Sequence, residues 1–135
     1  MSAWRRKALE LLPQHRTLIE AAESPMALWI ELHLRFCDHV RSGDRAAERA
    51  VLEYASWCAH EGAGTGPSDT LTAVICAFYE NIGGEKELWP RFKEWFQPRE
   101  FEGLATAFRY FLTGAEFQHL RETFYAGPRR STKRR

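Results

Sequence analysis

The sequence predicts an all-α fold. Apolar residues recur every three or four positions in successive segments, and Gly, Pro or N-capping residues separate these segments. No segment alternates apolar and polar residues for long enough to predict a strand. The 135 residues fit one domain, and 44% apolar with 27% charged residues is typical of a globular protein. We therefore predict a compact bundle of about seven short-to-medium helices over residues 1–127, with solenoid-like helical hairpins as an alternative.

The central helix of this bundle is predicted over residues 24–41. Ser24 is a favourable N-cap, and Pro25 suits the first helical position because its missing N–H has no partner there. Glu31 and Arg35 stand four residues apart on a narrow polar stripe. Most of the remaining circumference is apolar, so this helix should be covered on more than one side. Its apolar positions are Met26, Leu28, Trp29, Ile30, Leu32, Leu34, Phe36, Cys37 and Val40.

Two short helices should precede the central helix, and one should follow it closely. Residues 2–12 form an amphipathic segment that Pro13 ends, and residues 14–23 form a second one. After the central helix, Gly43 supplies a left-handed C-terminal position and Asp44 caps the next helix, residues 45–60. A turn this short predicts that these two helices are antiparallel neighbours.

The second half of the chain alternates helices with clear breaks. Residues 62–69, GAGTGPSD, are predicted as a loop, and the helix after it runs to Ile82 before Gly83-Gly84. Residues 85–96 are aromatic-rich and broken by Pro90. Further helices are predicted over 98–112 and 114–125, the last beginning with a capping box of Thr113 and Glu116. Residues 128–135 are predicted to be a disordered tail.

The cysteines and the termini favour a cytoplasmic protein. Cys37, Cys58 and Cys76 are odd in number, far apart and set among apolar residues, which favours reduced, buried thiols over disulfides. No apolar run approaches the ~18–20 residues of a membrane span. The N-terminus lacks the apolar core of a signal peptide. We therefore expect no membrane association and a cytoplasmic location.

The near-neutral charge conceals a basic C-terminus. The net charge is +1, from 19 basic and 18 acidic residues, but residues 128–135 contain five basic residues and no acidic ones. The rest of the chain is therefore mildly acidic, which argues against nucleic-acid binding by the helical domain. Weak, salt-sensitive association of nucleic acid with the tail is an alternative function. The basic side chains of the tail are Arg129, Arg130, Lys133, Arg134 and Arg135.

Four segments resemble a family of small uncharacterised bacterial all-helical proteins. These are SPMALWIELHLRF, SGD followed by YASWC, TAVICAFYENI and EFEGLATAFRYFLTGAEF. The resemblance covers roughly residues 4–121, and it implies a compact helical domain from a bacterium. It implies no catalytic residue, because the family has no established activity.

The sequence contains no catalytic, nucleotide-binding or metal-binding motif. GAGTG at 62–66 lacks the Lys-Ser/Thr of a phosphate-binding loop, and no G-x-S-x-G is present. His33 and Cys37 stand four apart on one face of the central helix, a spacing that suits two metal ligands. Two ligands do not complete a tetrahedral site, so we predict a buried His33 that is hydrogen-bonded to a carboxylate or carbonyl, and no metal or cofactor. A small-molecule or metal-binding cavity near His33 is kept as an alternative.

The aromatic segment 85–96 is the strongest candidate for recognition of another protein. Its large rings cannot all point inward from one helix of three turns. Either Pro90 breaks the segment, so that each ring reaches the core and simply caps it, or some rings stay outside as an interaction patch. The predicted patch consists of Trp89, Phe92, Trp95 and Phe96. We therefore expect a non-enzymatic interaction or accessory module whose partner is another protein.

Overall fold

Every regular element is helical in the computed structural model, which describes residues 1–60 and 69–127. No strand occurs in those ranges, so the predicted all-α class is confirmed. The chain divides into two compact units, Met1–Phe78 and Tyr79–Arg135. Within the described ranges, no helix is both long and apolar enough to cross a membrane.

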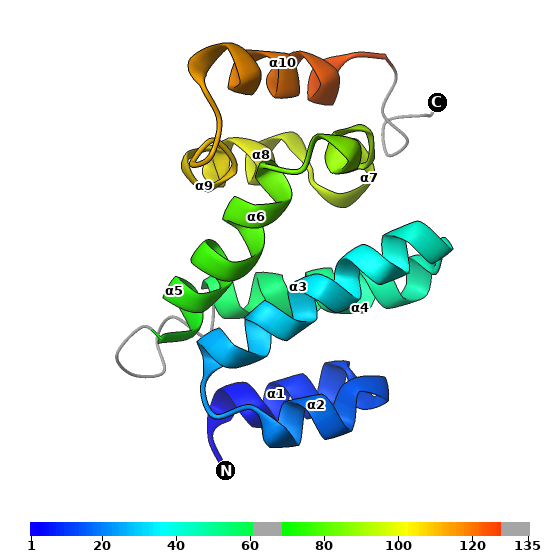
Figure 1. The fold of residues 1–135 in the computed structure, drawn as a ribbon, viewed down its shortest axis with the longest axis vertical. Coiled ribbons are helices and arrows are strands. Elements are labelled where there is room, and N and C mark those ends of the chain that lie inside the picture. The colour runs from blue at the N-terminus through cyan, green and yellow to red at the C-terminus, as the bar shows by residue number, and fades with distance from the viewer. Residues whose placement is uncertain (61–68, 128–135) are drawn as a thin grey trace. The chain divides into compact units, whose positions relative to one another are not determined.

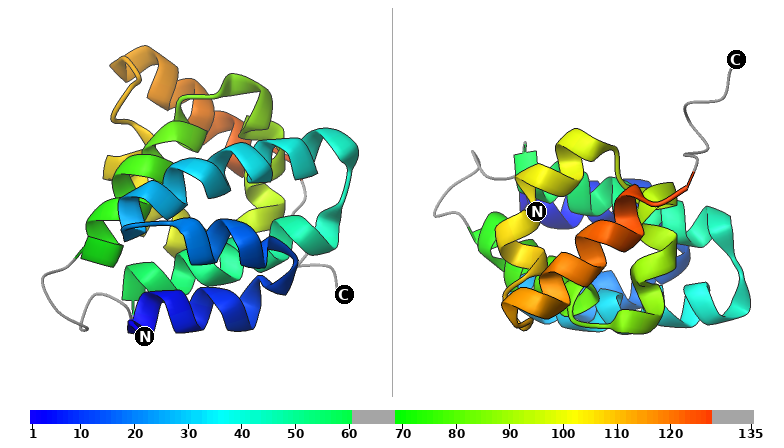
Figure 2. Two further views of the ribbon diagram at one scale, coloured as in Figure 1. Left: turned by 60° about the horizontal axis from the view of Figure 1, so that its bottom comes forward. Right: turned by 90° about the horizontal axis from the view of Figure 1, so that it is seen from above.

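The first unit is built around two long antiparallel helices, α3 and α4 (Figure 1). α3 packs against both α4 and α5, and α1 packs against α4 and α2 (Figure 2). The unit ends in η3, a π-helical turn that continues α5. The elements are α1 (Ala3–Leu11), η1 (Pro13–His15), α2 (Arg16–Ala21), α3 (Pro25–Ser42), α4 (Arg45–His60), α5 (Asp69–Val74) and η3 (Ile75–Tyr79).

Both ends of α3 form as the sequence predicts. The Ser24 hydroxyl accepts a hydrogen bond from the Ala27 N–H at 3.1 Å, which satisfies one of the donors left without a helical partner. Gly43 adopts φ 75°, a left-handed conformation that favours glycine. The Asp44 carboxylate then accepts from the Ala47 N–H at 3.1 Å and caps α4.

Stacked aromatic rings form the core of the first unit. The Trp29 ring stacks on Tyr54 with centroids 5.4 Å apart and lies 5.0 Å from Phe78. Phe36 meets Phe78 edge-on at 5.1 Å. The Tyr54 hydroxyl donates to the Trp4 carbonyl at 2.9 Å, and this bond ties α4 to α1. Aromatic pairs of this geometry stabilise a core beyond their buried area.

One side of α3 departs from the predicted apolar cover. Leu28, Trp29 and Leu32 are buried, as expected for a central helix. However, Met26, Ile30 and Leu34 are 36%, 50% and 50% exposed. These three residues stand four apart and form one continuous ridge, which we call the α3 stripe. The stripe adjoins the predicted polar face, so the uncovered part of the helix is wider than the charged residues alone indicate.

The second unit consists of short helices joined by tight turns. Residues 98–112, predicted as one helix, divide into α8 and α9 at Leu104, whose φ and ψ of −103° and 6° are not helical. α10 packs against η4 and α7, while α6 packs against α9. The elements are α6 (Glu80–Gly83), η4 (Lys86–Arg91), α7 (Phe92–Trp95), α8 (Pro98–Gly103), α9 (Ala105–Phe108) and α10 (Gly114–Tyr125).

A capping box stabilises the start of α10, and aromatic contacts join the helices of the second unit. The predicted box at α10 forms, since Thr113 and Glu116 exchange hydrogen bonds of 2.8 and 3.1 Å. In the core, the Phe101 ring stacks on Phe124 at 4.1 Å. Phe108 is fully buried and contacts the rings of Tyr79, Phe92, Phe96 and Phe101.

The helices α6 and α9 approach each other closely at Gly83. A Cβ atom at this position would lie only 2.6 Å from the Phe108 Cα and still nearer to the Phe108 carbonyl oxygen. Atoms at such separations overlap, so only glycine fits here without movement of the backbone. The packing of the second unit therefore depends on the absence of a side chain at this position.

Candidate functional site

The aromatic residues predicted as an interaction patch lie mainly in the core. Phe92 is fully buried, Phe96 and Trp89 are 4% and 5% exposed, and Trp95 is half-buried. Three of the four rings are therefore core residues, which agrees with the alternative of simple core capping and contradicts an exposed patch for these three. Pro90 lies in the 3₁₀ helix η4, and the chain changes to an α-helix at Phe92, so the rings are not confined to one helical wheel.

The same segment contributes one wall of a shallow groove between η4 and α10. The Trp89 indole N–H donates to the Gly83 carbonyl at 2.8 Å, which fixes the ring that lines the groove. The His119 ring lies 5.7 Å from it, and Lys86 pairs with Glu116 at 3.1 Å. The groove has a volume of about 380 Å³. Its lining residues are Lys86, Trp89, Pro90, Ala115, Glu116, His119 and Thr123.

The ion pair at this groove is reinforced by the start of α10. A hydrogen bond from the Thr113 backbone N–H lowers the pKa of Glu116, and Lys86 acts in the same direction. Glu116 is therefore both the third helical residue of the capping box and an acceptor for the Lys86 ammonium. Because these charges already satisfy each other, the groove offers an apolar surface with little net charge.

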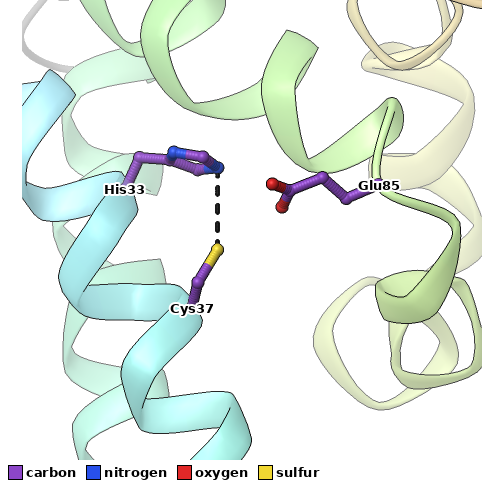
Figure 3. A group of neighbouring side chains, drawn as sticks. All are labelled: His33, Cys37 and Glu85. Atoms are coloured by element: carbon purple, nitrogen blue, oxygen red, sulfur yellow. Dashed lines mark hydrogen bonds between the residues drawn. The ribbon is translucent and has the colours of Figure 1, made fainter.

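His33 and Cys37 are brought together on α3, as their spacing predicts. The Cys37 Sγ lies 3.7 Å from the His33 Nε2, and both side chains are half-buried (Figure 3). The third side chain drawn there, Glu85, belongs to the other unit. A hydrogen-bond contact of His33 is present, and it joins the ring to the Cys37 thiol, whereas the predicted partner was a carboxylate or carbonyl; full burial of the ring was wrong.

A second histidine pair was not predicted from the sequence. His15 in η1 and His39 near the end of α3 place their Nε2 atoms 3.2 Å apart. Both rings are half-buried, and their centroids are 5.4 Å apart. Burial, followed by the charges of His39 and Arg35, lowers the pKa of His15. No spacing rule reveals this pair, because the two residues come from different elements and meet only in the folded unit.

The three cysteines differ in accessibility, which corrects the prediction that all are buried. Cys58 is fully buried, Cys37 is half-buried and Cys76 is exposed. Burial raises the pKa of the Cys58 thiol to about 11, although the neighbouring Trp29 and Tyr54 side chains partly oppose this shift. Cys76 lies in the π-helical turn η3, where the wider turn changes which residues face the core.

We expect thiol-specific reagents to modify Cys76 rapidly and Cys58 only after unfolding. At pH 8 a thiol with a pKa of about 11 is thiolate in about one molecule per thousand, and Cys58 also has no exposed surface. Maleimide labelling followed by peptide mass spectrometry measures both rates. Cys76→Ser should remove the fast phase, and labelling of Cys58 as fast as that of Cys76 would contradict the buried position.

The α3 stripe borders a second groove, between α2 and α3. This groove has a volume of about 450 Å³ and a floor of small apolar side chains. Two carboxylates, Glu23 and Glu31, are part of its wall, and we therefore call it the acidic groove. Its lining residues are Leu18, Ala21, Ala22, Glu23, Ser24, Ala27 and Glu31. Ala27 and Glu31 follow Met26 and Ile30 by one residue, so groove and stripe share α3 as a common border.

Exposed aromatic rings also occur in the second unit. Tyr110 and Phe111, between α9 and α10, are 65% and 58% exposed, and their rings meet edge-on at 5.0 Å. Unlike the α3 stripe, this pair lies in an irregular segment between two short helices. The basic side chains predicted as a nucleic-acid tail, residues 129–135, lie outside the described residues.

Comparison with known proteins adds no assignment to this geometry. No protein-family model matches the chain, and no curated protein matches its sequence. No solved structure matches it either. The resemblance to small bacterial helical proteins therefore stays a prediction, and function has to be argued from the surfaces and side-chain pairs described above.

Proposed function

We propose that the chain is a protein-interaction module whose recognition surface is the α3 stripe together with the acidic groove. The observation that carries this proposal is the exposure of Met26, Ile30 and Leu34 on the 18-residue helix α3. An isolated exposed apolar residue is ordinary on a protein surface, but three at four-residue spacing form a continuous ridge. Burial of such a ridge against a partner releases its hydration water and favours association.

The acidic groove indicates the chemistry of the partner. A helix of about 10 Å diameter lying along α3 would cover the stripe and place its flank against the groove. Glu23 and Glu31 favour basic side chains on that flank, since opposite charges across an interface guide association and fix its orientation. We therefore propose an amphipathic helix with Lys or Arg beside its apolar face as the partner element.

The aromatic segment 85–96 is not part of this proposed surface. With Phe92 and Phe96 in the core of the second unit, it offers fewer exposed rings than its composition indicates. The α3 stripe is instead built on a capped helix with a fixed backbone, which lowers the entropic cost of binding. A rigid helix face with apolar anchors is a common recognition surface.

A site-specific photo-crosslinker tests the proposal. The amino acid p-benzoylphenylalanine is placed at Leu34 in one variant and at Tyr110 in a control variant, within cells that produce the chain. We expect a partner adduct of defined mass from position 34 and none of that mass from position 110. The captured protein is identified by mass spectrometry, purified and titrated against the purified chain.

The binding measurement then separates the stripe from general exposed apolar surface. Ile30→Ser combined with Leu34→Ser should weaken binding by about 100-fold, because two central apolar anchors are lost. The control, Tyr110→Ser, removes a more exposed apolar side chain, 65% against 50%, from the other unit and should change affinity less than about twofold. Equal adducts from both positions, or unchanged affinity of the double variant, would overturn the proposal.

A further inference from the structure

The histidine pair of the first unit has the geometry of a partial metal site. His15 and His39 come from η1 and α3, 24 residues apart in the sequence, and their Nε2 atoms are 3.2 Å apart. Zinc–imidazole bonds of about 2.0–2.1 Å to atoms at this separation subtend about 100° at the metal. This value lies between the angles of octahedral and tetrahedral coordination. The ring centroids are 5.4 Å apart, so the two nitrogens face each other nearly head-on, and each ring must turn away from the other before both lone pairs point at one ion.

We propose that His15 and His39 bind one divalent transition-metal ion of the Zn²⁺ and Cu²⁺ class through their two Nε2 atoms. This assignment is independent of the interaction surface proposed above. In the metal-free pair, one neutral ring donates its Nε2–H to the other ring. Metal binding moves that proton to Nδ1 of the donor ring, so both Nε2 lone pairs face the ion and no net proton is released.

The surroundings of the pair define which metals it takes. Imidazole nitrogen suits Zn²⁺, Cu²⁺ and Ni²⁺, whereas Mg²⁺ and Ca²⁺ prefer oxygen ligands. Among the described residues, no third His, Cys, Asp or Glu lies close enough to both rings to make a three-residue group. Water therefore fills the remaining coordination positions. Partial burial keeps His15 in the neutral form that binds metal, whereas the nearby Arg35 charge repels a cation and limits the affinity.

A metal bound here would stabilise the first unit. The ion would connect η1, which begins at Pro13, to the last turns of α3. Because this arrangement exists only in the folded unit, binding shifts the unfolding equilibrium toward the folded state. The other pair, His33 and Cys37, lies within one helix and connects no second element of this unit, so metal bound there would have a smaller effect on tertiary stability.

Titration of the tag-free full chain with ZnCl₂ tests this site. We expect one Zn²⁺ per chain by calorimetry and a melting temperature that rises with Zn²⁺ concentration. His15→Ala and His39→Ala should each weaken binding by more than roughly 10-fold, since loss of even an outer partner of a metal ligand costs about that much. His60→Ala, which changes an exposed histidine of the same unit, and His33→Ala are the matched controls and should retain binding.

A measurement on the unmodified chain guards against variants that fold poorly. Substoichiometric Cu²⁺ should broaden the amide signals flanking residues 15 and 39 in ¹H–¹⁵N spectra before those flanking 33 and 60. The spectrum of the bound Cu²⁺ in electron paramagnetic resonance should show coupling to two equivalent nitrogens. Binding that survives in His15→Ala and His39→Ala, or broadening centred on residue 33, would overturn the proposal. Absence of Zn²⁺ binding would also overturn the proposal, and the two histidines would then form only a hydrogen bond.

Discussion

Trp29→Ala is expected to destabilise the first unit by about 3–5 kcal/mol. The ring has no exposed surface, and it stacks between Tyr54 and Phe78 at the centre of the aromatic core. Its removal deletes the largest fully buried side chain of the unit and leaves a cavity that two other rings cannot fill without losing their own contacts. The loss is a large part of the stability of an ordinary domain.

Urea unfolding followed by circular dichroism measures this loss, with two comparison variants. Ile30→Ala alters the next residue of α3, which is 50% exposed, and should change the free energy of unfolding by less than about 0.5 kcal/mol. Trp29→Phe keeps an aromatic ring and removes an indole N–H that has no nitrogen or oxygen acceptor among the described residues. It should therefore cost less than Trp29→Ala. A change below about 1 kcal/mol for Trp29→Ala would contradict the position of the ring at the core.

Helix ends were the features most accessible from the sequence, because they depend on a few adjacent residues. Ser24 and Pro25 define the start of α3, and Gly43 with Asp44 defines its end and the start of α4. Thr113 and Glu116 do the same for α10. In each case the capping bond joins atoms within three residues, so no knowledge of the tertiary fold is needed.

The burial of apolar residues was less accessible, because it depends on which neighbours cover a helix. Leu32 and Leu34 are the same residue type two positions apart, yet one is fully buried and the other is 50% exposed. The helical wheel places them on different sides of α3, but it does not say which side α4 and α5 will occupy. Cys76 illustrates a second cause, since a π-helical turn shifts the phase of the pattern that the α-helical period of 3.6 assumes.

The contacts of the candidate site residues also divide into local ones, which the sequence pattern predicts, and long-range ones, which it does not. The contact between His33 and Cys37 follows from four-residue spacing within one helix, and the structure shows it. The contact between His15 and His39 joins residues 24 positions apart, so no local pattern contains it. The aromatic segment 85–96 combines both cases. Pro90 indicates a break in the helix, which is a local signal. The direction of the rings after the break depends on Phe108 and the helices that surround it.

Gly83→Ala is expected to destabilise the second unit by about 3 kcal/mol or more, at the upper end of overpacking substitutions. The added Cβ would lie 2.6 Å from the Phe108 Cα, and backbone atoms cannot rotate away as the end of a flexible side chain can. Either α6 or α9 must move, and Phe108 would carry with it the rings of Phe92, Phe96 and Phe101. The steric cost exceeds the gain of about 1 kcal/mol that alanine brings to a helix.

Gly103→Ala is the matched control, because Gly103 ends α8 and an added Cβ meets no atom within 4 Å. This substitution should be neutral or stabilise the chain by up to about 1 kcal/mol, through the lower entropy of the unfolded state. Fluorescence provides a local readout, since the Trp89 indole is bonded to the Gly83 carbonyl at 2.8 Å and should change its emission when that backbone shifts. Equal urea midpoints for Gly83→Ala and Gly103→Ala would show that α6 and α9 are not in backbone contact, and the packing of the second unit would have to be redrawn around a wider gap between them.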